Sequence, residues 1–473
     1  MHFQPKNGSL SIVFGCCAVK KEAQKRNIVL SILVSKKSQS LGGDITVPGD
    51  KSVSHRALML GGLAIGETTV EGLLEGEDVL ATAQAMRQMG ALVDHPSEAG
   101  GLWRVVGRGV GGLSEPSDVL NMGNSGTAAR LLIGVLAAHP FNAFFTGDHS
   151  LNKRPMTRIT KPLEQMGARF STRSEGRMPM CVLGSDQLIP IEYELPVASA
   201  QVKSAVLFAG MNTAGKTTVI EPQSTRDHSE RMLNHFGAEV VTTPLDNGGC
   251  SVTITGYPEL TGQHVIVPGD ISSAAFPMVA GLVVPGSELT IRGVGVNPLR
   301  TGLIDSLVEM GADLRLENQR DQAGEPVADL VIRASSLKGI EVPPERAPSM
   351  IDEYPILCVA AACAEGSTRM SGIGELRVKE CDRLAAMARG LTAAGVDVEE
   401  GEDWLVVHGV GSTGRAPKGG TSVAVELDHR IAMSFLVLGM ISDEPVSIDD
   451  GSPIATSFPG FEALMNGLGA SIS

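Results

Sequence analysis

The sequence predicts an α/β protein of two lobes, because one module of helices and strands recurs six times along the chain. Each copy opens with a polar residue before an apolar helix, passes through a glycine turn into a β-run, and closes on a second helix. A period of about 70 to 85 residues exceeds the usual solenoid unit and fits a βαβ-type subdomain. Three copies precede residue 268 and three follow it, so we expect two pseudo-threefold lobes joined there.

The first helix of each copy has the features of a helix N-terminus. In the first copy Asp50 or Ser52 can cap a helix that continues into the apolar run 57–60. The six openings lie at residues 50–52, 124–127, 199–201, 269–272, 352–355 and 428–430. Helix starts present free N–H groups and the positive end of the dipole, so six starts facing one region would attract anions.

The second helix of each copy ends at a glycine, which is favoured just beyond a helix C-terminus. The six closings lie at residues 89–91, 166–168, 236–238, 310–312, 394–396 and 468–470. One turn of the module, 210–217, fits the phosphate-loop pattern. A helix leads into it and a strand leaves it, the reverse of the order that a nucleotide-binding loop needs.

Composition excludes several classes of protein. A chain of 473 residues is too long for one core and predicts about two large domains. With 39 Lys and Arg against 53 Asp and Glu, the net charge of −14 argues against a general nucleic-acid or membrane-surface role. An anionic ligand must therefore be held by a local group of cations.

Cysteine and histidine spacing predicts a reduced, cytoplasmic protein without a metal. The 7 Cys are irregularly spaced, and neither a CxxC pair nor a His pair with ligand spacing occurs. No apolar run approaches the ~18 residues that a membrane span requires.

The first forty residues differ from the rest, with seven Lys or Arg and one acid, Glu22. We expect a basic extension over 1–41 that is disordered or reflects a start codon assigned too far upstream, and a signal or transit peptide is the other alternative. Lobe one would then comprise residues 42–49 with 269–473, and lobe two residues 50–268.

The copy openings also hold the chain's most concentrated chemistry. Cations recur there, and the carboxylates of Asp352 and Glu380 lie among them, where they could transfer protons. Taken singly, a cation near a helix start is usually a solvated charge and an aspartate there is usually a cap. Recurrence at the same place in a repeat favours a binding role.

Five segments together resemble the 5-enolpyruvylshikimate-3-phosphate synthase family. They are residues 49–56, 123–127, 154–156, 377–383 and 428–430. The resemblance covers residues 42–473, and 199–201 with 225–228 look like the family's second bacterial class. It implies an inside-out α/β barrel of two lobes, each with three βαβαββ units. It also implies a monomer without a cofactor that transfers the enolpyruvyl group of phosphoenolpyruvate to the 5-hydroxyl of shikimate 3-phosphate.

The resemblance also implies residue roles. Asp352 would accept the hydroxyl proton, Glu380 would protonate the methylene carbon, and Lys51 would act between the substrates. Shikimate 3-phosphate would be held by Lys51, Ser52, Arg56, Ser199, Ala200, Gln201, Arg226, Asp352 and Lys379. Phosphoenolpyruvate would be held by Lys51, Asn124, Gly126, Thr127, Arg154, Gln201, Arg383 and Arg430.

Two departures and two rival interpretations accompany the resemblance. Many relatives carry a lysine shortly before the C-terminal Phe-Pro, and here Phe458 follows Ser457 with none nearby. Ala200 stands where one class of the family has a second serine, which fits the other class. Gly126 stands where some glyphosate-tolerant relatives have alanine, so we expect room for glyphosate. One rival is the sister enzyme acting on UDP-N-acetylglucosamine, and Ser52 and the lack of a suitable loop cysteine argue against it. The other is a scaffold that binds a polyanion, and the carboxylates of Asp352 and Glu380 argue against that.

Overall fold

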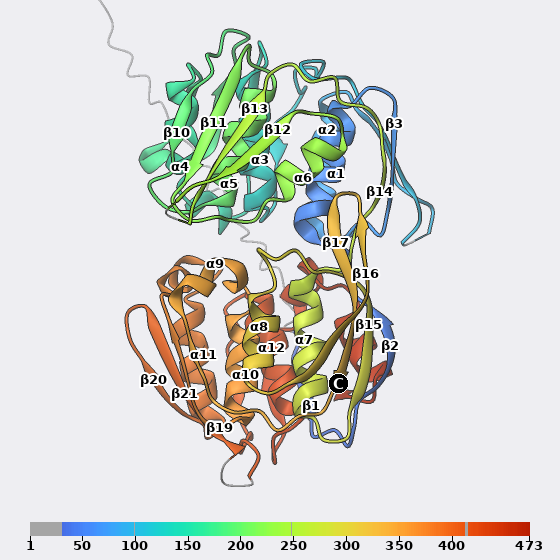
Figure 1. Cartoon of the computed structure of the whole chain (residues 1–473), viewed down its shortest axis with the longest axis vertical. Coiled ribbons are helices and arrows are strands. Elements are labelled where there is room, and N and C mark those ends of the chain that lie inside the picture. The colour runs from blue at the N-terminus through green and yellow to red at the C-terminus, as the bar shows by residue number, and fades with distance from the viewer. Residues whose placement is uncertain (1–30, 99, 247, 412–414) are drawn as a thin grey trace, which may run out of the picture.

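The chain folds into two lobes, each with its own hydrophobic core (Figure 1). The computed structural model describes residues 31–98, 100–246, 248–411 and 415–473. One core draws on residues between Val53 and Val267, and the other on Leu41, Val47 and residues between Ile271 and Ile472. The predicted two-lobed α/β architecture is confirmed.

Lobe two contains three units of the repeated module. The first comprises β14 (His264–Ile266), α1 (Lys51–Leu63), β3 (Glu67–Glu71), α2 (Glu77–Gln88), β4 (Leu92–Asp94) and β5 (Trp103–Val106). The second comprises β6 (Leu120–Asn121), α3 (Gly126–Ala137), β7 (Asn142–Thr146), α4 (Thr157–Gln165), β8 (Arg169–Arg173) and β9 (Arg177–Leu183). The third comprises β10 (Glu192–Glu194), α5 (Ala200–Met211), β11 (Lys216–Glu221), α6 (His228–His235), β12 (Val240–Pro244) and β13 (Cys250–Thr255).

Lobe one contains the other three units. The fourth comprises β2 (Gly42–Thr46), α7 (Ile271–Val283), β15 (Glu288–Gly295), α8 (Gly302–Glu309), β16 (Asp313–Gln322) and β17 (Glu325–Arg333). The fifth comprises β18 (Glu341–Val342), α9 (Ala347–Met350), α10 (Tyr354–Cys363), β19 (Glu365–Ser371), α11 (Arg383–Ala393), β20 (Asp397–Glu400) and β21 (Trp404–Val410). The sixth comprises β22 (Ser422–Val423), α12 (His429–Gly439), β23 (Val446–Ile448), α13 (Phe461–Gly467), β24 (Ser471–Ile472) and β1 (Leu33–Lys36).

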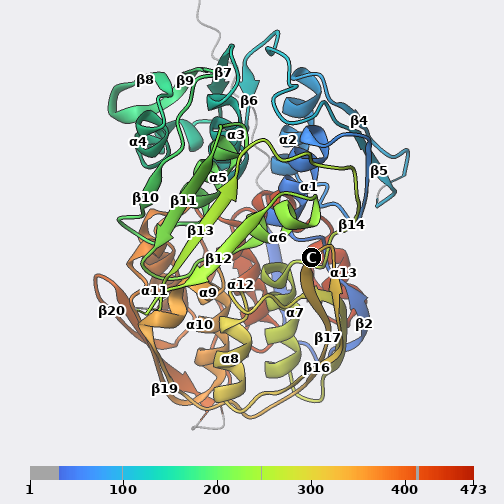
Figure 2. The same cartoon turned by 45° about the horizontal axis from the view of Figure 1, so that its top comes forward.

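Each unit folds its strands into a four-stranded sheet of the same topology. In β10-β11-β13-β12, for example, β10 pairs with β11 in parallel and the other neighbours are antiparallel. The first helix of a unit lies inside its lobe and the sheets lie outside (Figure 2). Helix α7 is buried at every position from Ile271 to Leu282, which fits a helix that is apolar all round. The phosphate-loop-like segment 210–217 is the turn between α5 and β11, as its order predicts.

The prediction of a disordered extension over residues 1–41 is wrong for its last part. Strand β1 runs between β23 and β24, with Ser35 opposite Val446 on one side and Ile472 on the other. The sixth unit supplies only three strands from the C-terminal part of the chain, and β1 completes its sheet. Residues 1–30, which carry the rest of the predicted extension, lie outside the described residues.

Helix α12 packs so closely on β1 that Gly439→Ala should be destabilising. An added Cβ would lie 2.7 Å from Ser35 Cβ and 2.8 Å from its carbonyl oxygen. We expect the free energy of unfolding to fall by about 1–3 kcal/mol, as in other overpacked cores. Urea denaturation measures it, with Gly467→Ala as the control, because no atom lies within 4 Å of a Cβ there. Equal stability of the two variants would contradict the packing of β1.

The two chain crossings between the lobes lie side by side. Gly49 forms a bridge with Gly269, the Asp50 N–H donates to Pro268 O at 2.7 Å, and the Asp270 N–H donates to Pro48 O at 2.9 Å. A Cβ on Gly49 would lie 2.0 Å from the carbonyl oxygen of Gly72, so the crossing has no room for a side chain there. Helices α1 and α7 begin directly after these crossings.

A hairpin makes a further contact between the lobes. Strands β16 and β17 rise from lobe one to α6 of lobe two (Figure 1). At the tip, Arg231 Nη1 donates to the carbonyl of Gly324 at 3.2 Å, and His228 Nδ1 lies 2.7 Å from Glu325 Oε1. Within the described ranges, no helix is both long and apolar enough to cross a membrane.

Candidate active site at the lobe boundary

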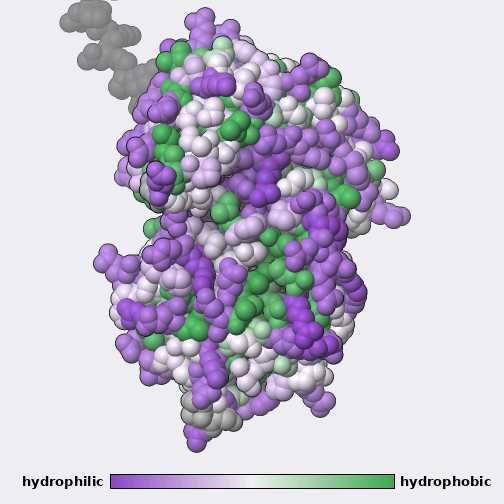
Figure 3. Space-filling model, viewed as in Figure 1, coloured by the Kyte–Doolittle hydropathy of each residue, from purple (hydrophilic) through white to green (hydrophobic). Residues whose placement is uncertain are grey.

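The first helices of the six units begin at or near the boundary between the lobes. Three begin with an aspartate, Asp50, Asp270 or Asp428, whose carboxylate accepts an N–H two or three residues further on at 2.9 Å. These are among the caps that the copy openings predicted. On the face shown in Figure 3, hydrophilic residues gather along the edge of the upper lobe that meets the lower one.

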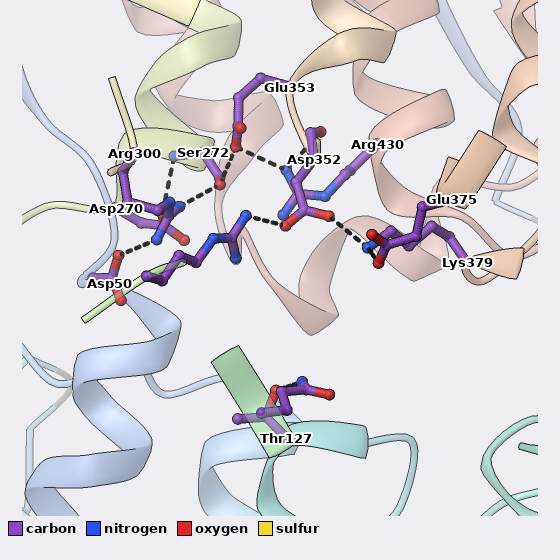
Figure 4. Close-up of polar contacts among 12 residues, drawn as sticks. Asp50, Thr127, Asp270, Ser272, Arg300, Asp352, Glu353, Glu375, Lys379 and Arg430 are labelled. Atoms are coloured by element: carbon purple, nitrogen blue, oxygen red, sulfur yellow. Dashed lines mark hydrogen bonds and ion pairs between the residues drawn. The ribbon is translucent and has the colours of Figure 1, made fainter. Parts of the chain in front are cut away.

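Asp352 is the centre of a group of cations from both lobes. Its Oδ2 accepts from Arg226 Nη2 of lobe two at 2.8 Å. Its Oδ1 accepts from Arg383 Nη1 at 3.2 Å and lies 3.9 Å from Lys379 Nζ. Its backbone carbonyl accepts from Arg430 Nη1 at 3.1 Å (Figure 4). The structure therefore brings together predicted site residues that are far apart in the sequence.

Arg383 holds three carboxylates while its side chain is only 1% exposed. Its Nε donates to Asp428 Oδ2 at 2.7 Å, its Nη2 to Glu380 Oε2 at 2.6 Å, and its Nη1 to Asp352. These contacts use three of the five N–H groups of a guanidinium. Burial among three carboxylates fixes the plane of Arg383, which suits it to bidentate recognition of a further anion.

The two candidate proton-transfer groups are both held ionised. Burial alone would raise the pKa of Asp352, but Arg430, Lys379, Arg226 and Arg383 outweigh it and hold that pKa well below its ordinary value. Burial likewise opposes ionisation of Glu380, yet Arg383 and other positive groups keep its pKa far below the usual range. Opposite charge, not hydrogen bonding by neutral groups, dominates at both positions.

A second group of predicted residues lies at the starts of α3 and α5. Gln201 Nε2 donates to Thr127 Oγ1 at 3.1 Å, and its Oε1 accepts from Arg130 Nη1 at 2.8 Å. Burial lowers the pKa of Arg130 to about 10, with Arg154 adding to the effect. Arg130 therefore orients Gln201.

Arg154 and Asn124 complete this second group. Arg154 Nη2 donates to Asn124 Oδ1 at 3.2 Å, and Asn124 Nδ2 donates to Asp148 Oδ2 at 2.6 Å. Gly126 lies between the guanidinium groups, since a Cβ there would be 2.7 Å from Arg130 Nη1 and 3.4 Å from Arg154 Nη1. Two cations beside the N-terminus of α3, which Ser125 caps, make this a place where a phosphate could bind.

Lys51 and its neighbours form the lobe-two side. Lys51 Nζ forms an ion pair with Asp78, and its side chain is 27% exposed. Ser199 caps α5 without a side-chain hydrogen bond, which leaves its hydroxyl available, and Ala200 follows as the first helical residue. The carbonyl of Ser52 accepts from Arg56 Nη1 at 2.9 Å.

Arg56 does not join the group around Asp352. It is 4% exposed and donates through Nε to Ser229 Oγ at 2.8 Å and through Nη2 to Ser204 Oγ at 3.1 Å. Burial lowers its pKa to about 10. In this structure Arg56 ties α1 to α5 and α6, and its contact with shikimate 3-phosphate stays a prediction.

Several contacts of the site had no signal in the sequence. Arg300 lies between β15 and α8, outside every motif, and contacts residues of both chain crossings. Ser272 and Glu353 were visible at copy openings, yet nothing in their spacing connects residues 81 positions apart. Asp78 pairs with Lys51 from the second helix of the same unit, which the repeat did not predict.

Comparison with known proteins gives one consistent result. The family model for EPSP synthase (3-phosphoshikimate 1-carboxyvinyltransferase) matches residues 35–465. The 3-phosphoshikimate 1-carboxyvinyltransferase of Paramagnetospirillum magneticum is 63% identical over 446 residues, covering 94% of this chain and 99% of the relative. That of Rhodospirillum rubrum is 62% identical over 439 residues, covering 92% and 97%.

Solved structures agree with the sequence relatives. A structure of EPSP synthase from Acinetobacter baumannii superposes with a TM-score of 0.84 at 46% identity, covering 93% of this chain and 99% of the other. The predicted resemblance and the two-lobed fold are therefore confirmed along nearly the whole chain, and the chain belongs to the EPSP synthase family.

Proposed function

We propose that Asp352 and Glu380 carry the proton transfers of the family's reaction in this chain. The chain transfers the enolpyruvyl group of phosphoenolpyruvate to the 5-hydroxyl of shikimate 3-phosphate and releases phosphate, a step toward chorismate and the aromatic amino acids. The observation that carries the proposal is the convergence of Arg226, Lys379 and Arg383 on Asp352 from both lobes.

In the first step Asp352 accepts the proton of the 5-hydroxyl of shikimate 3-phosphate, and the oxygen of that hydroxyl attacks C2 of phosphoenolpyruvate. Glu380 gives a proton to the methylene carbon, so C3 becomes a methyl group and a tetrahedral intermediate forms. In the second step the intermediate loses phosphate and a methyl proton returns to a base, which restores the enol double bond. Positioned acid and base groups of this kind contribute about 10²–10⁴-fold each.

The ion pairs around these carboxylates connect substrate binding with the protonation of Asp352 and Glu380. A phosphate bound by Arg226 would compete with Asp352 for that guanidinium, which lies 2.8 Å from Oδ2. A substrate carboxylate at Arg383 would likewise compete with Glu380. Added negative charge raises the pKa of a carboxyl group, so substrate binding would make Glu380 able to hold the proton that it must donate.

The remaining assignments divide the site between the substrates. In this proposal shikimate 3-phosphate is bound by residues of both lobes: Lys51, Ser52, Arg56, Ser199, Ala200, Gln201, Arg226, Asp352 and Lys379. Phosphoenolpyruvate contacts Lys51, Asn124, Gly126, Thr127, Arg154, Gln201, Arg383 and Arg430. Arg383 and Arg430 take its carboxylate, a task suited to planar guanidinium groups.

The test of the proposed function is release of phosphate from phosphoenolpyruvate by the purified full chain. We expect release with shikimate 3-phosphate and none with UDP-N-acetylglucosamine, and the reverse would favour the sister enzyme. Release with neither acceptor would leave the scaffold interpretation. That the protein is a monomer, is cytoplasmic and needs no cofactor stays a prediction. Light scattering tests whether it is a monomer, and activity after chelation tests whether it needs a metal cofactor.

Gly126→Ala should weaken the contact with phosphoenolpyruvate. The new Cβ would lie 2.7 Å from Arg130 Nη1, so the guanidinium that orients Gln201 must move. A displacement of about 1 Å can cost roughly 10²-fold, and we expect KM for phosphoenolpyruvate to rise about 10- to 100-fold. KM for shikimate 3-phosphate should change less, because the displaced Arg130 guanidinium lies beside the start of α3, where phosphoenolpyruvate is proposed to bind.

The same variant tests whether glyphosate fits. We expect glyphosate to inhibit the wild type and to inhibit Gly126→Ala at least tenfold more weakly, on the order of 1.4 kcal/mol. Inhibition constants measured against phosphoenolpyruvate decide it. Equal constants would show that position 126 does not limit the space.

A further inference from the structure

A buried chain of polar contacts crosses the lobe boundary at Arg300 (Figure 4). The Arg300 side chain is 3% exposed. Its Nη1 lies 3.3 Å from Asp50 Oδ2, and its Nη2 lies 3.4 Å from Asp270 Oδ1. Asp50 caps α1 and Asp270 caps α7, so one guanidinium holds the two helices that begin at the crossings.

The contacts continue from Arg300 to the residues around Asp352. Arg300 Nη2 donates to Ser272 Oγ at 2.8 Å, and the Ser272 hydroxyl donates to Glu353 Oε1. Glu353 is 1% exposed, and its Oε1 lies 3.7 Å from Arg430 Nη1. That same nitrogen donates to the backbone carbonyl of Asp352 at 3.1 Å.

Ser272 is the link on which the orientation of Glu353 depends. Among the described residues, Glu353 Oε2 has no hydrogen-bond partner, so Oε1 makes the side chain's contacts with Ser272 and Arg430. A buried carboxylate that loses a donor seeks the nearest remaining cation, because its desolvation is otherwise uncompensated. For Glu353 that cation is Arg430.

Arg300 also has a charge role at the crossings. Burial raises the pKa of Asp270 to about 6, with Asp50 adding to the effect and Arg300 opposing it. Removing Arg300 would leave buried carboxylates facing each other, which is strongly destabilising. A clean test therefore changes the link to Glu353 and keeps Arg300.

We propose that Arg300 and Ser272 are positioning residues, which fix Glu353 and thereby hold Arg430 in the orientation that receives the carboxylate of phosphoenolpyruvate. The inference rests on the proposed role of Arg430. Without the Ser272 hydroxyl, Arg430 turns toward Glu353 and away from the Asp352 carbonyl. The binding of phosphoenolpyruvate then weakens, whereas the binding of shikimate 3-phosphate, which other residues carry, does not.

The test compares Ser272→Ala with Ser273→Ala in the full chain. Both serines are 4% exposed and lie in the first turn of α7, but Ser273 is not part of the chain of polar contacts from Arg300 to Glu353. For Ser272→Ala we expect KM for phosphoenolpyruvate to rise roughly tenfold, with KM for shikimate 3-phosphate within about twofold of the wild type. Ser273→Ala should leave both values within about twofold.

Two outcomes would overturn the inference. One is an unchanged KM for phosphoenolpyruvate in Ser272→Ala, and the other is an equal rise in Ser273→Ala. If Ser272→Ala does not fold, Glu353→Gln replaces it, because glutamine keeps the size and removes the charge that orients Arg430. The same selective rise is expected there, and its absence counts against the proposal. Failure of the proposed function would be seen separately, as no phosphate release by the wild type.

Discussion

Replacing Asp352 by alanine is expected to lower kcat by about 10²- to 10⁴-fold, the range for loss of a positioned general base. Its carboxylate is the group on which Arg226, Lys379 and Arg383 converge, so alanine removes the acceptor at the centre of the site. The fold should survive, because Arg383 keeps its contacts with Glu380 and Asp428. Phosphate release at saturating substrates measures the loss.

A matched control separates catalysis from a general effect of charge. Asp443 is 59% exposed and pairs with Lys37 at 2.9 Å on the surface, so Asp443→Ala should leave kcat within about twofold. Asp352→Asn should lose as much activity as Asp352→Ala, because the amide cannot accept the proton. Turnover of Asp352→Ala within a few-fold of the wild type would sink the assignment of the base.

Glu380→Gln is expected to reduce kcat by a similar factor, about 10²–10⁴, while the unfolding transition stays near that of the wild type. Glutamine can still accept the hydrogen bond that Arg383 Nη2 donates at 2.6 Å, but it has no proton to give to carbon. If Asp352→Ala and Glu380→Gln both turned over near the normal rate, the mechanism would be wrong.

The lowered pKa of Glu380 also predicts that the number of bound protons changes when the substrates bind. Its pKa lies far below the usual value because Arg383 and other cations outweigh its burial, so it is ionised at neutral pH before substrates bind. A second carboxylate at Arg383 raises that pKa, so the protein should take up protons when phosphoenolpyruvate binds with shikimate 3-phosphate. Calorimetry in buffers of different ionisation enthalpy measures the uptake. Glu380→Gln should abolish it, and proton release by the wild type would contradict it.

The repeat predicted the skeleton of the site. The aspartate at a copy opening caps its helix at Asp50, Asp270 and Asp428, because a polar residue before an apolar run has few other uses. The family resemblance predicted the residues that gather around Asp352. The division into lobes followed from counting copies on either side of residue 268.

What the sequence could not predict depends on contacts between distant segments. Strand β1 is four residues long, and its place in the sixth sheet follows only from pairing with β23 and β24. Arg300 stands in no repeated position, and its partner Asp50 lies 250 residues away. The hydrogen bonds from Arg56 to Ser204 and Ser229 likewise depend on how three helices pack, which the motif around Arg56 does not show.

The pairing of β1 with β24 also has a consequence for how the protein is made. Lobe two draws its three sheets from one uninterrupted stretch, so it can assemble while the ribosome is still translating. Lobe one cannot close its sixth sheet until Ile472 has been synthesised and can meet Ser35. The nascent chain must therefore keep its early strand Leu33–Lys36 unpaired through almost all of translation, and joining these ends is a contact of very long range.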